Sequence, residues 1–348
     1  MSEVIYNQTY LSDLETALKS IPRIESLRNK TTIVTGSTGM IGSAIVDCLM
    51  AANVTNKLNI KIIAGVRNID KGLKRFAHWN DNSLLKFIKY DTKTGIENNE
   101  RADYIIHAAG YASPNLYVSN PVEVMESNFI GMYNLLDYAQ KTNVEKLIYL
   151  SSSEVYGAKT TTEPWREDMQ GSLDLLAFRS CYASSKRATE TLCSAYMKEY
   201  SVNTVIARPG HIYGPTALSS DTKASTQFAA LAKINENIVL KSKGDQIRSY
   251  CYMLDCASAI ITLLICGENG EAYNISNPNS IASIRQLAEG FAEASGVEVI
   301  FSNPTDKEKE AFNPMDNSSL NSEKLIGLGW HGAFDLMLGV RHTLKGIY

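Results

Sequence analysis

The 348-residue chain has few of the residues that hold small secreted domains or metal centres together. Its six cysteines are scattered and form no Cys-x-x-Cys pair. A chain of this length can bury a sufficient core without disulfides, so we expect reduced thiols and a cytoplasmic location. The five histidines are equally dispersed, and we therefore expect no metal site.

Long apolar segments and an excess of one charge are also missing. No apolar run reaches about 18 residues, the length that would predict a membrane span. The first residues lack the basic and then apolar pattern of a secretory signal. The net charge is −3 and no basic block stands out, so we expect no nucleic-acid partner and no membrane partner.

The most informative pattern that is present covers residues 31–50. A short apolar run leads into Gly36, Gly39 and Gly42, and an amphipathic helical pattern follows. Such glycines let the backbone turn sharply and approach a pyrophosphate, which binds amide groups at the helix N-terminus. An ordinary strand–loop–helix turn has the same appearance, and the spacing differs from the G-x-G-x-x-G of many dinucleotide-binding proteins. Other motifs must therefore decide.

A second pattern supports a dehydrogenase-type site. Tyr182 and Lys186 are four residues apart in a segment of helical periodicity, so they share one helix face. An ammonium and a cationic nicotinamide would lower the tyrosine pKa, which is normally about 10, and favour proton removal from a sugar hydroxyl. The apolar run at 147–150 ends in serines 151–153, and active sites form at the carboxyl ends of such strands. An exposed Tyr/Lys pair is the alternative.

Strand and helix patterns alternate from residue 31, which predicts an α/β fold with a Rossmann-type, doubly wound parallel sheet. We expect strands at 32–35, 60–65, 85–90, 104–108, 147–150 and 204–207, and helices at about 40–52, 121–142 and 183–200. Residues 1–30 are expected to form an N-terminal extension with a helix outside the core. Residues 31–208 would form the dinucleotide-binding domain and 209–348 mainly a smaller substrate-binding lobe, with about 251–268 returning to the first domain.

Several segments resemble the extended short-chain dehydrogenases/reductases of the nucleotide-sugar epimerase/dehydratase group, over about residues 30–330. They include SSSEVYG, RSCYASSKRATETLC, ARPGHIYGP and GDQIRSYCYMLD. Within that group the chain is most similar to UDP-glucuronate decarboxylases. The resemblance implies a nucleotide-sugar substrate, NAD or NADP as cofactor, and a 4-keto intermediate. We also expect a homodimer.

The resemblance also implies roles for individual residues. Tyr182 would be the general base, Lys186 would lower its pKa and hold the nicotinamide ribose, and Ser152 would hydrogen-bond the sugar 4-OH. Ser153 and Glu154 complete the expected catalytic set. The expected cofactor-binding residues are Gly36, Ser37, Thr38, Gly39, Met40, Ile41, Gly42, Arg67, Asp91, Ala108, Ala109, Tyr182 and Lys186. The expected substrate-binding residues are Tyr117, Arg179, His211, Lys241 and Arg248.

Alternatives stay open at several of these positions. Arg248 would pair with the substrate diphosphate, since guanidinium geometry suits that contact, but it could also be a surface arginine. Arg179 could be a second anion contact or only a charge at a helix start. Asn128 could support a relay beside the site or merely pack its helix. For Asp255 we favour a helix N-cap over a catalytic acid.

The residues after Ser152 bear on the fate of the 4-keto intermediate. In 4,6-dehydratases an Asp-Glu pair stands at the positions of Ser153 and Glu154, so the absent aspartate disfavours dehydration. In C4 epimerases these positions are usually small or neutral. Decarboxylases match best, because a C6 carboxylate beside the ketone makes a β-keto acid that loses carbon dioxide readily. We predict a decarboxylase, with a C4 epimerase as the alternative and a 4,6-dehydratase less favoured.

Three positions depart from the decarboxylase pattern. The acidic residue expected at the end of the second strand is Val66, and Arg67 follows it. A cation there suits the 2′-phosphate of NADP, although a solvent-facing arginine beside NAD fits equally well. His211 replaces an asparagine, and Lys241 replaces a stacking aromatic residue. These two changes leave the identity of the sugar and of the base open.

One interpretation of another class is a dinucleotide-sensing binding protein without catalysis. Glu154 likewise has a second interpretation, as a structural carboxylate bonded to the following turn. The presence of Ser152, Tyr182 and Lys186 together argues against the sensor, because a sensor needs no complete catalytic set.

Overall fold

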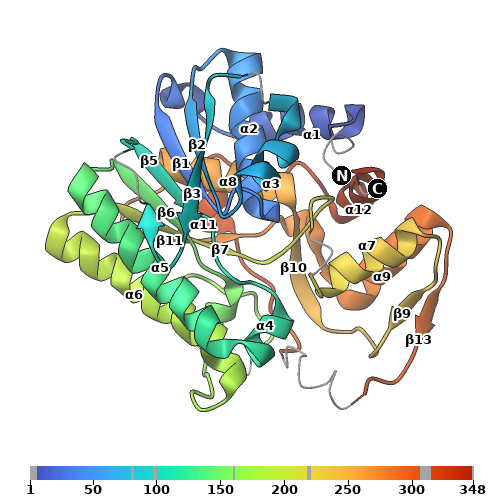
Figure 1. The fold of residues 1–348 in the computed structure, drawn as a ribbon. Coiled ribbons are helices and arrows are strands. Elements are labelled where there is room, and N and C mark those ends of the chain that lie inside the picture. The colour runs from blue at the N-terminus through green and yellow to red at the C-terminus, as the bar shows by residue number, and fades with distance from the viewer. Residues whose placement is uncertain are drawn as a thin grey trace.

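The computed structural model describes residues 6–79, 82–96, 100–159, 161–217, 221–305 and 315–346. Its centre is an eight-stranded sheet in the order β11-β7-β6-β5-β1-β2-β3-β4, parallel throughout except for β3 and β4 (Figure 1). The strands are β1 (Thr31–Thr35), β2 (Lys61–Val66), β3 (Leu85–Asp91), β4 (Gly95–Ile96), β5 (Tyr104–His107), β6 (Lys146–Leu150), β7 (Thr204–Pro209) and β11 (Ala272–Ile275). All six expected strands are present, and the predicted fold class is confirmed.

Helices cover both faces of this sheet. One layer contains α2 (Met40–Asn56) and α8 (Met253–Cys266), and the other contains α5 (Pro121–Thr142) and α6 (Cys181–Tyr200) (Figure 1). Successive side chains of a strand pack against opposite helix layers, because side chains alternate between the two faces of a sheet. Ile106 and Ile148 pack with the first layer, whereas Ile105 and Leu147 pack with the second. Burial on both faces explains the uninterrupted apolar runs of these strands.

A smaller region lies beside the sheet and contains two short sheets. One comprises β12 (Ile281–Ser283), β10 (Ile247–Tyr252) and β8 (His211–Tyr213), and the other β13 (Val299–Phe301) and β9 (Ile238–Leu240). The helices of this region are α7 (Ala224–Lys233), α9 (Ile284–Ser295) and α12 (Leu336–Gly346) (Figure 1). The further helices are α1 (Gln8–Lys19), α3 (Ile69–Arg75), α4 (Pro114–Ser119) and α11 (Glu323–Ile326). The 3₁₀ turns are η1 (Ile24–Leu27), η2 (Ala77–Trp79), η3 (Ser153–Tyr156), η4 (Phe178–Ser180) and η5 (Pro278–Ser280). The domain limits drawn from the sequence stay a prediction.

The N-terminal helix α1 is part of the core, which corrects the expectation of a helix outside it. It packs on α2, α8 and α12, and its Tyr10, Leu14 and Leu18 are buried in the main apolar cluster. Asp13 of α1 lies 2.8 Å from the Nδ1 atom of His342 in α12 and accepts a hydrogen bond from Tyr252. The extension therefore packs against the last helix, and α1 and α12 lie side by side in Figure 1.

Asp47, inside α2, anchors this arrangement with a fully buried carboxylate. It accepts hydrogen bonds from Tyr6 and Tyr10, both at 2.7 Å, from Trp79 at 2.8 Å and from the Arg75 guanidinium at 2.6 Å. A buried carboxylate is tolerated only when donors of this kind replace water. The donors come from α3, η2 and the N-terminal segment, so Asp47 links these segments to α2.

We predict that Asp47→Asn lowers the free energy of unfolding by about 3 to 5 kcal/mol, because it leaves the half-buried Arg75 charge without its partner. Urea denaturation at neutral pH measures this loss. The control is Asp137→Asn, which breaks an exposed pair with Lys141 one helical turn away and should cost less than about 0.5 kcal/mol. Equal effects of the two substitutions would contradict the anchoring role.

Among the described residues, no helix combines the length and apolar character that crossing a membrane requires. The same residues contain no group of three or more histidine, cysteine, aspartate or glutamate side chains placed to hold a metal ion.

Candidate active site

A cavity of about 630 Å³ lies between the carboxyl ends of the central strands and the smaller region. From β1 the strands β2 to β4 are added on one side, and β5, β6, β7 and β11 are added on the other side. Ligands of such folds bind at the point where the order of the strands reverses. The predicted site residues that line the cavity are Met40, Ile41, Ala108, Ala109, Tyr117, Ser152, Ser153, Glu154, Arg179, Tyr182, Lys186, His211, Lys241 and Arg248. Residues spread over some 200 positions of the sequence thus meet at one place.

The glycine turn between β1 and α2 is built for close approach. Gly36 has a φ of +66°, and a Cβ atom there would lie 2.7 Å from the carbonyl oxygen of Ala108. A Cβ atom at Gly42 would lie 2.3 Å from the carbonyl oxygen of Gly36. Ser37 is buried and donates a hydrogen bond to the carbonyl of Val34, so its side chain holds the turn. Neither glycine position has room for a side chain.

Gly39 is the N-cap residue of α2, and no side chain caps this helix. Uncapped amides at a helix N-terminus bind phosphate groups, and Met40 and Ile41 of the first turn line the cavity. Besides Gly39, the same turn contains four predicted residues that do not line the cavity, Gly36, Ser37, Thr38 and Gly42. The turn therefore fits the pyrophosphate of a dinucleotide.

Tyr182 and Lys186 project from the first turns of α6. The ring of Tyr182 stacks on that of Tyr117 at a centroid distance of 4.5 Å. Burial and the negative charge of Glu154 raise the pKa of Tyr182 to about 12, although a hydrogen bond with Ser152 lowers it. Burial lowers the pKa of Lys186 to about 7. The phenol therefore needs additional positive charge before it can act as a base near neutral pH.

Lys186 is held between strand and helix. Its Nζ atom donates a hydrogen bond to the carbonyl of Leu150 at 2.7 Å and lies 4.7 Å from the ring centroid of Tyr149. The same atom lies 5.8 Å from the ring centroid of Tyr182. A positive charge on Lys186 would therefore favour the phenolate.

Glu154 and Arg179 form an ion pair in the cavity wall, with 3.3 Å between Oε2 and Nη1. Arg179 lies in η4, and its guanidinium is 6.0 Å from the ring centroid of Tyr117. Arg179 thus belongs to the cavity and is more than a charge before a helix. Among the described residues, the Glu154 carboxylate contacts this arginine, and the choice between a catalytic and a structural role for Glu154 stays a prediction.

Arg248 is buried and is not a surface arginine. Its Nη1 atom donates hydrogen bonds to the carbonyls of Ile247 at 2.9 Å and Met315 at 2.8 Å. His211 also lines the cavity, and its buried Nδ1 atom has no hydrogen-bond partner within the described chain. Burial, together with the charges of Arg248 and Lys223, lowers the pKa of His211 to about 3. A neutral imidazole with an unsatisfied nitrogen is therefore available to a ligand.

Outside the glycine turn, two further predicted cofactor-binding residues, Arg67 and Asp91, do not line the cavity. Arg67 is exposed just after β2, with its guanidinium 6.0 Å from the ring centroid of Tyr111, which does line the cavity. Asp91, at the end of β3, accepts a hydrogen bond from the amide of Lys93. Their part in cofactor binding stays a prediction.

Asn128 and Asp255 have clear surroundings. Asn128 donates a hydrogen bond to Ser185 at 3.0 Å, while its buried Oδ1 atom lacks a partner within the described chain. That oxygen favours a relay over simple helix packing. The N-cap prediction for Asp255 is wrong, because Tyr252 is the N-cap of α8. The Asp255 carboxylate instead accepts hydrogen bonds from the backbone amides of Ala333 and Phe334, because amides away from water need an acceptor.

Sequence reasoning missed several residues of the cavity. Lys223 lines it and influences His211, but it lies in an irregular segment without a motif. Tyr250 and Gln246 line it as well, and the Oε1 atom of Gln246 is buried without a partner within the described chain. Both belong to the segment GDQIRSY, in which the sequence analysis assigned a role to Arg248 alone. Alternation along β10 could have indicated Tyr250.

The sheet, the glycine turn and the Ser/Tyr/Lys set at one cavity define the class of this protein. It is an enzyme of the extended short-chain dehydrogenase/reductase type with a Rossmann-type domain. The expectation of an enzyme is confirmed.

The chain belongs to the NAD dependent epimerase/dehydratase family, whose model matches residues 32–276. It is 31% identical over 290 residues to UDP-glucuronic acid decarboxylase 5 of Arabidopsis thaliana, covering 81% of this chain and 82% of that protein. It is 28% identical over 318 residues to UDP-glucuronic acid decarboxylase 1 of Xenopus tropicalis, covering 90% and 71%. A solved UDP-glucose 4-epimerase complex with NAD from Thermus thermophilus is 25% identical, with a TM-score of 0.72 and coverage of 91% and 98%. The resemblance inferred from the motifs is confirmed.

We predict that Gly36→Ala reduces dinucleotide affinity by about 100-fold or more and also destabilises the fold, because the methyl group meets backbone atoms. Calorimetric titration with NAD and NADP measures the affinity. Gly296→Ala is a matched control, since Gly296 has a φ of +74° but nothing within 4 Å of its Cβ position. The control should cost about 1 kcal/mol of stability and leave affinity unchanged. Undiminished binding by Gly36→Ala would exclude the turn as the pyrophosphate site.

Proposed function

We propose that this protein is an NAD(P)-dependent nucleotide-sugar enzyme that works through a 4-keto intermediate, most similar in reaction to UDP-glucuronate decarboxylases. One observation carries the proposal: Ser152, Tyr182 and Lys186 share a cavity with the first turn of α2, which follows the glycine turn, and with the Glu154–Arg179 pair. The names of the relatives, which are decarboxylases of UDP-glucuronic acid, support the same reaction.

The residues present fit a nicotinamide dinucleotide. The turn at Gly36 and the N-terminus of α2 would hold its pyrophosphate, and Lys186 would hold the nicotinamide ribose. When bound, the nicotinamide would accept the hydride from sugar C4. Its positive charge would add to that of Lys186 and lower the raised pKa of Tyr182. Tyr182 can then take the proton of the 4-OH group, which Ser152 orients.

The other half of the cavity suits an acidic sugar and a diphosphate. Arg179 and Glu154 would lie near C6, and Arg179 could pair with a C6 carboxylate. Once C4 is a ketone, the C5–C6 bond can break because the ketone accepts its electron pair, and carbon dioxide leaves. C5 then takes a proton, which Glu154 would handle. The hydride would finally return to C4 while Tyr182 gives its proton back to the C4 oxygen, so the reaction leaves no net change in the cofactor. Arg248, Lys223 and His211 would face the diphosphate.

Tyr182→Phe should lower turnover by about 100-fold or more while leaving cofactor affinity unchanged, because the phenol moves the proton and adds little to dinucleotide binding. Mass spectrometry of products from a panel of nucleotide sugars measures turnover. It also separates loss of carbon dioxide, loss of water and no mass change. Tyr200→Phe, an exposed tyrosine at the end of the same helix, is the control and should behave as wild type. A variant with more than a tenth of the wild-type rate would remove Tyr182 as the base.

Glu154→Gln is expected to permit C4 oxidation and to slow the steps that follow it. Loss of the charge also removes one cause of the raised pKa of Tyr182, so oxidation should not suffer. Reduced nicotinamide would then accumulate in single-turnover absorbance traces.

An epimerase needs no acid or base at C5. A fully active Glu154→Gln variant that interconverts C4 epimers would therefore favour the alternative, a C4 epimerase. Loss of water from the product would instead favour a 4,6-dehydratase.

We propose that the cofactor is NADP rather than NAD, because Val66 stands where an acidic residue would hold an unmodified ribose and the cation of Arg67 follows it. The NAD in the solved epimerase supports only the wider class of nicotinamide dinucleotides. Calorimetric titration should show tighter binding of NADP, and Arg67→Ala should remove most of that preference. Lys71→Ala, an exposed lysine of α3, should have no effect. A clear preference for NAD that is unchanged in Arg67→Ala would refute this choice.

A homodimer and a cytoplasmic location stay predictions. Support for the dimer comes from α5, where Val122, Met125, Phe129 and Tyr133 form one exposed apolar stripe. Stripes of this kind commonly pack against a second copy. Light scattering should then give twice the 38.4 kDa mass of the chain.

A further inference from the structure

The helix face that carries Tyr182 and Lys186 continues to a third polar residue, Glu190. The three residues are four positions apart and so lie on one face of α6. Lys186 donates to the carbonyl of Leu150, and the hydroxyl of the next residue, Ser151, donates to Glu190 at 2.5 Å. Two successive residues at the end of β6 are therefore bound by two residues one turn apart on α6. The next residue is Ser152, which carries the hydroxyl of the proposed catalytic set.

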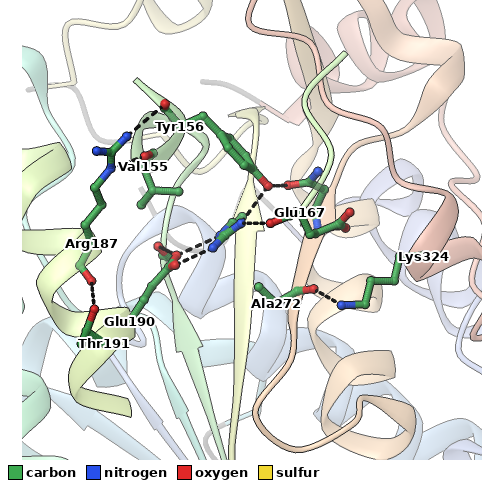
Figure 2. Close-up of polar contacts among 11 residues, drawn as sticks. Val155, Tyr156, Glu167, Arg187, Glu190, Thr191, Ala272 and Lys324 are labelled. Atoms are coloured by element: carbon green, nitrogen blue, oxygen red, sulfur yellow. Dashed lines mark hydrogen bonds and ion pairs between the residues drawn. The ribbon is translucent and has the colours of Figure 1, made fainter. Parts of the chain in front are cut away.

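The Glu190 carboxylate is itself held by a fork from the neighbouring strand. Arg208 of β7 donates to its two oxygens, with Nε 3.0 Å from Oε1 and Nη2 2.7 Å from Oε2. The Nη1 atom of Arg208 donates to the hydroxyl of Tyr156 at 3.0 Å, and that hydroxyl donates to Asn274 at 2.7 Å. In Figure 2 the Glu190 carboxylate points toward the guanidinium to which its dashed lines run, and Tyr156 lies above it. A two-bond contact of this kind sets orientation as well as distance.

Arg187, beside Lys186, holds the turn that carries Ser153 and Glu154. It donates to the carbonyl of Val155 at 2.5 Å and to that of Tyr156 at 3.0 Å (Figure 2). Tyr156 is thus bound at its carbonyl by Arg187 and at its hydroxyl by Arg208. Helix α6 and strand β7 together determine where η3 lies.

We propose that Glu190 is a positioning residue: through Ser151 and Arg208 it fixes the end of β6 against α6, and it places a carboxylate one helical turn from Lys186 on the same helix face. The inference rests on the proposed function, because the roles of Tyr182 and Lys186 belong to that proposal.

The charges around Lys186 support this role. The titratable groups that face it are His107 on β5, Tyr149 on β6, and Tyr182, Glu190 and Cys193 on α6. Burial lowers the pKa of His107 to about 3 and raises the pKa values of Tyr149, Cys193 and Tyr182, so all four are neutral at neutral pH. Glu190 is the charged member of this set. It opposes the burial that lowers the pKa of Lys186 to about 7.

The experiment compares Glu190→Gln with the double variant Glu190→Gln/Arg208→Gln. The single variant leaves the Arg208 charge unpaired and can lose stability for that reason alone, whereas the double variant restores the charge balance. The rate of the first oxidation is followed between pH 6 and 10 by nicotinamide absorbance. In parallel, the charge state of Lys186 is titrated without substrate by NMR of ¹³Cε-labelled lysine, assigned from Lys186→Arg.

We expect the alkaline fall in rate to move at least about half a pH unit lower in both variants, and the Lys186 titration to move with it. Glu271→Gln is the control, because it removes a carboxylate from an exposed pair with Lys324 and should change neither curve. A double variant with wild-type rate and titration curves would overturn the proposal. A shifted Lys186 titration in a protein that turns over no nucleotide sugar would support the positioning role and refute the proposed function instead.

Discussion

The site depends on the contact between the start of α6 and the end of β6. The helix supplies Tyr182 and Lys186, and the segment directly after the strand supplies Ser152. The hydrogen bonds of Lys186 to Leu150 and of Ser151 to Glu190 join them directly. The first bond is buried and the second partly buried, so they define distance and direction more strictly than surface bonds would.

Burial also determines the electrostatic state of the site. It raises the pKa of Tyr182 to about 12 and lowers that of Lys186 to about 7, so burial acts against the charged form of both groups. Such a pair is a poor base until positive charge is brought near it, and a nicotinamide cation would supply that charge. Proton transfer would then be restricted to the state with cofactor bound. On the other side, Arg179 and Arg248 introduce the cations that an acidic, phosphorylated sugar requires.

The sequence predicted the sheet well because its information was local and repeated. Strands such as 104–108 are buried on both faces and therefore apolar throughout, and the glycine turn marks the first crossover. It predicted the N-terminal segment and Asp255 less well. The helix of that segment is only partly apolar, and its burial depends on Asp47 finding donors from three distant segments. Asp255 likewise accepts hydrogen bonds from backbone amides almost eighty positions away in the sequence.

By itself, the sequence determined the fold class, the family and the candidate catalytic trio, because each is written in short-range spacing. A spacing of four positions between Tyr182 and Lys186 is enough to place both on one helix face. Only the tertiary structure decided that Arg248 is buried, that Glu154 pairs with Arg179 and that the Nδ1 atom of His211 has no partner among the described residues. Such facts depend on which distant elements pack together, and no local pattern records the charge or the burial that packing creates.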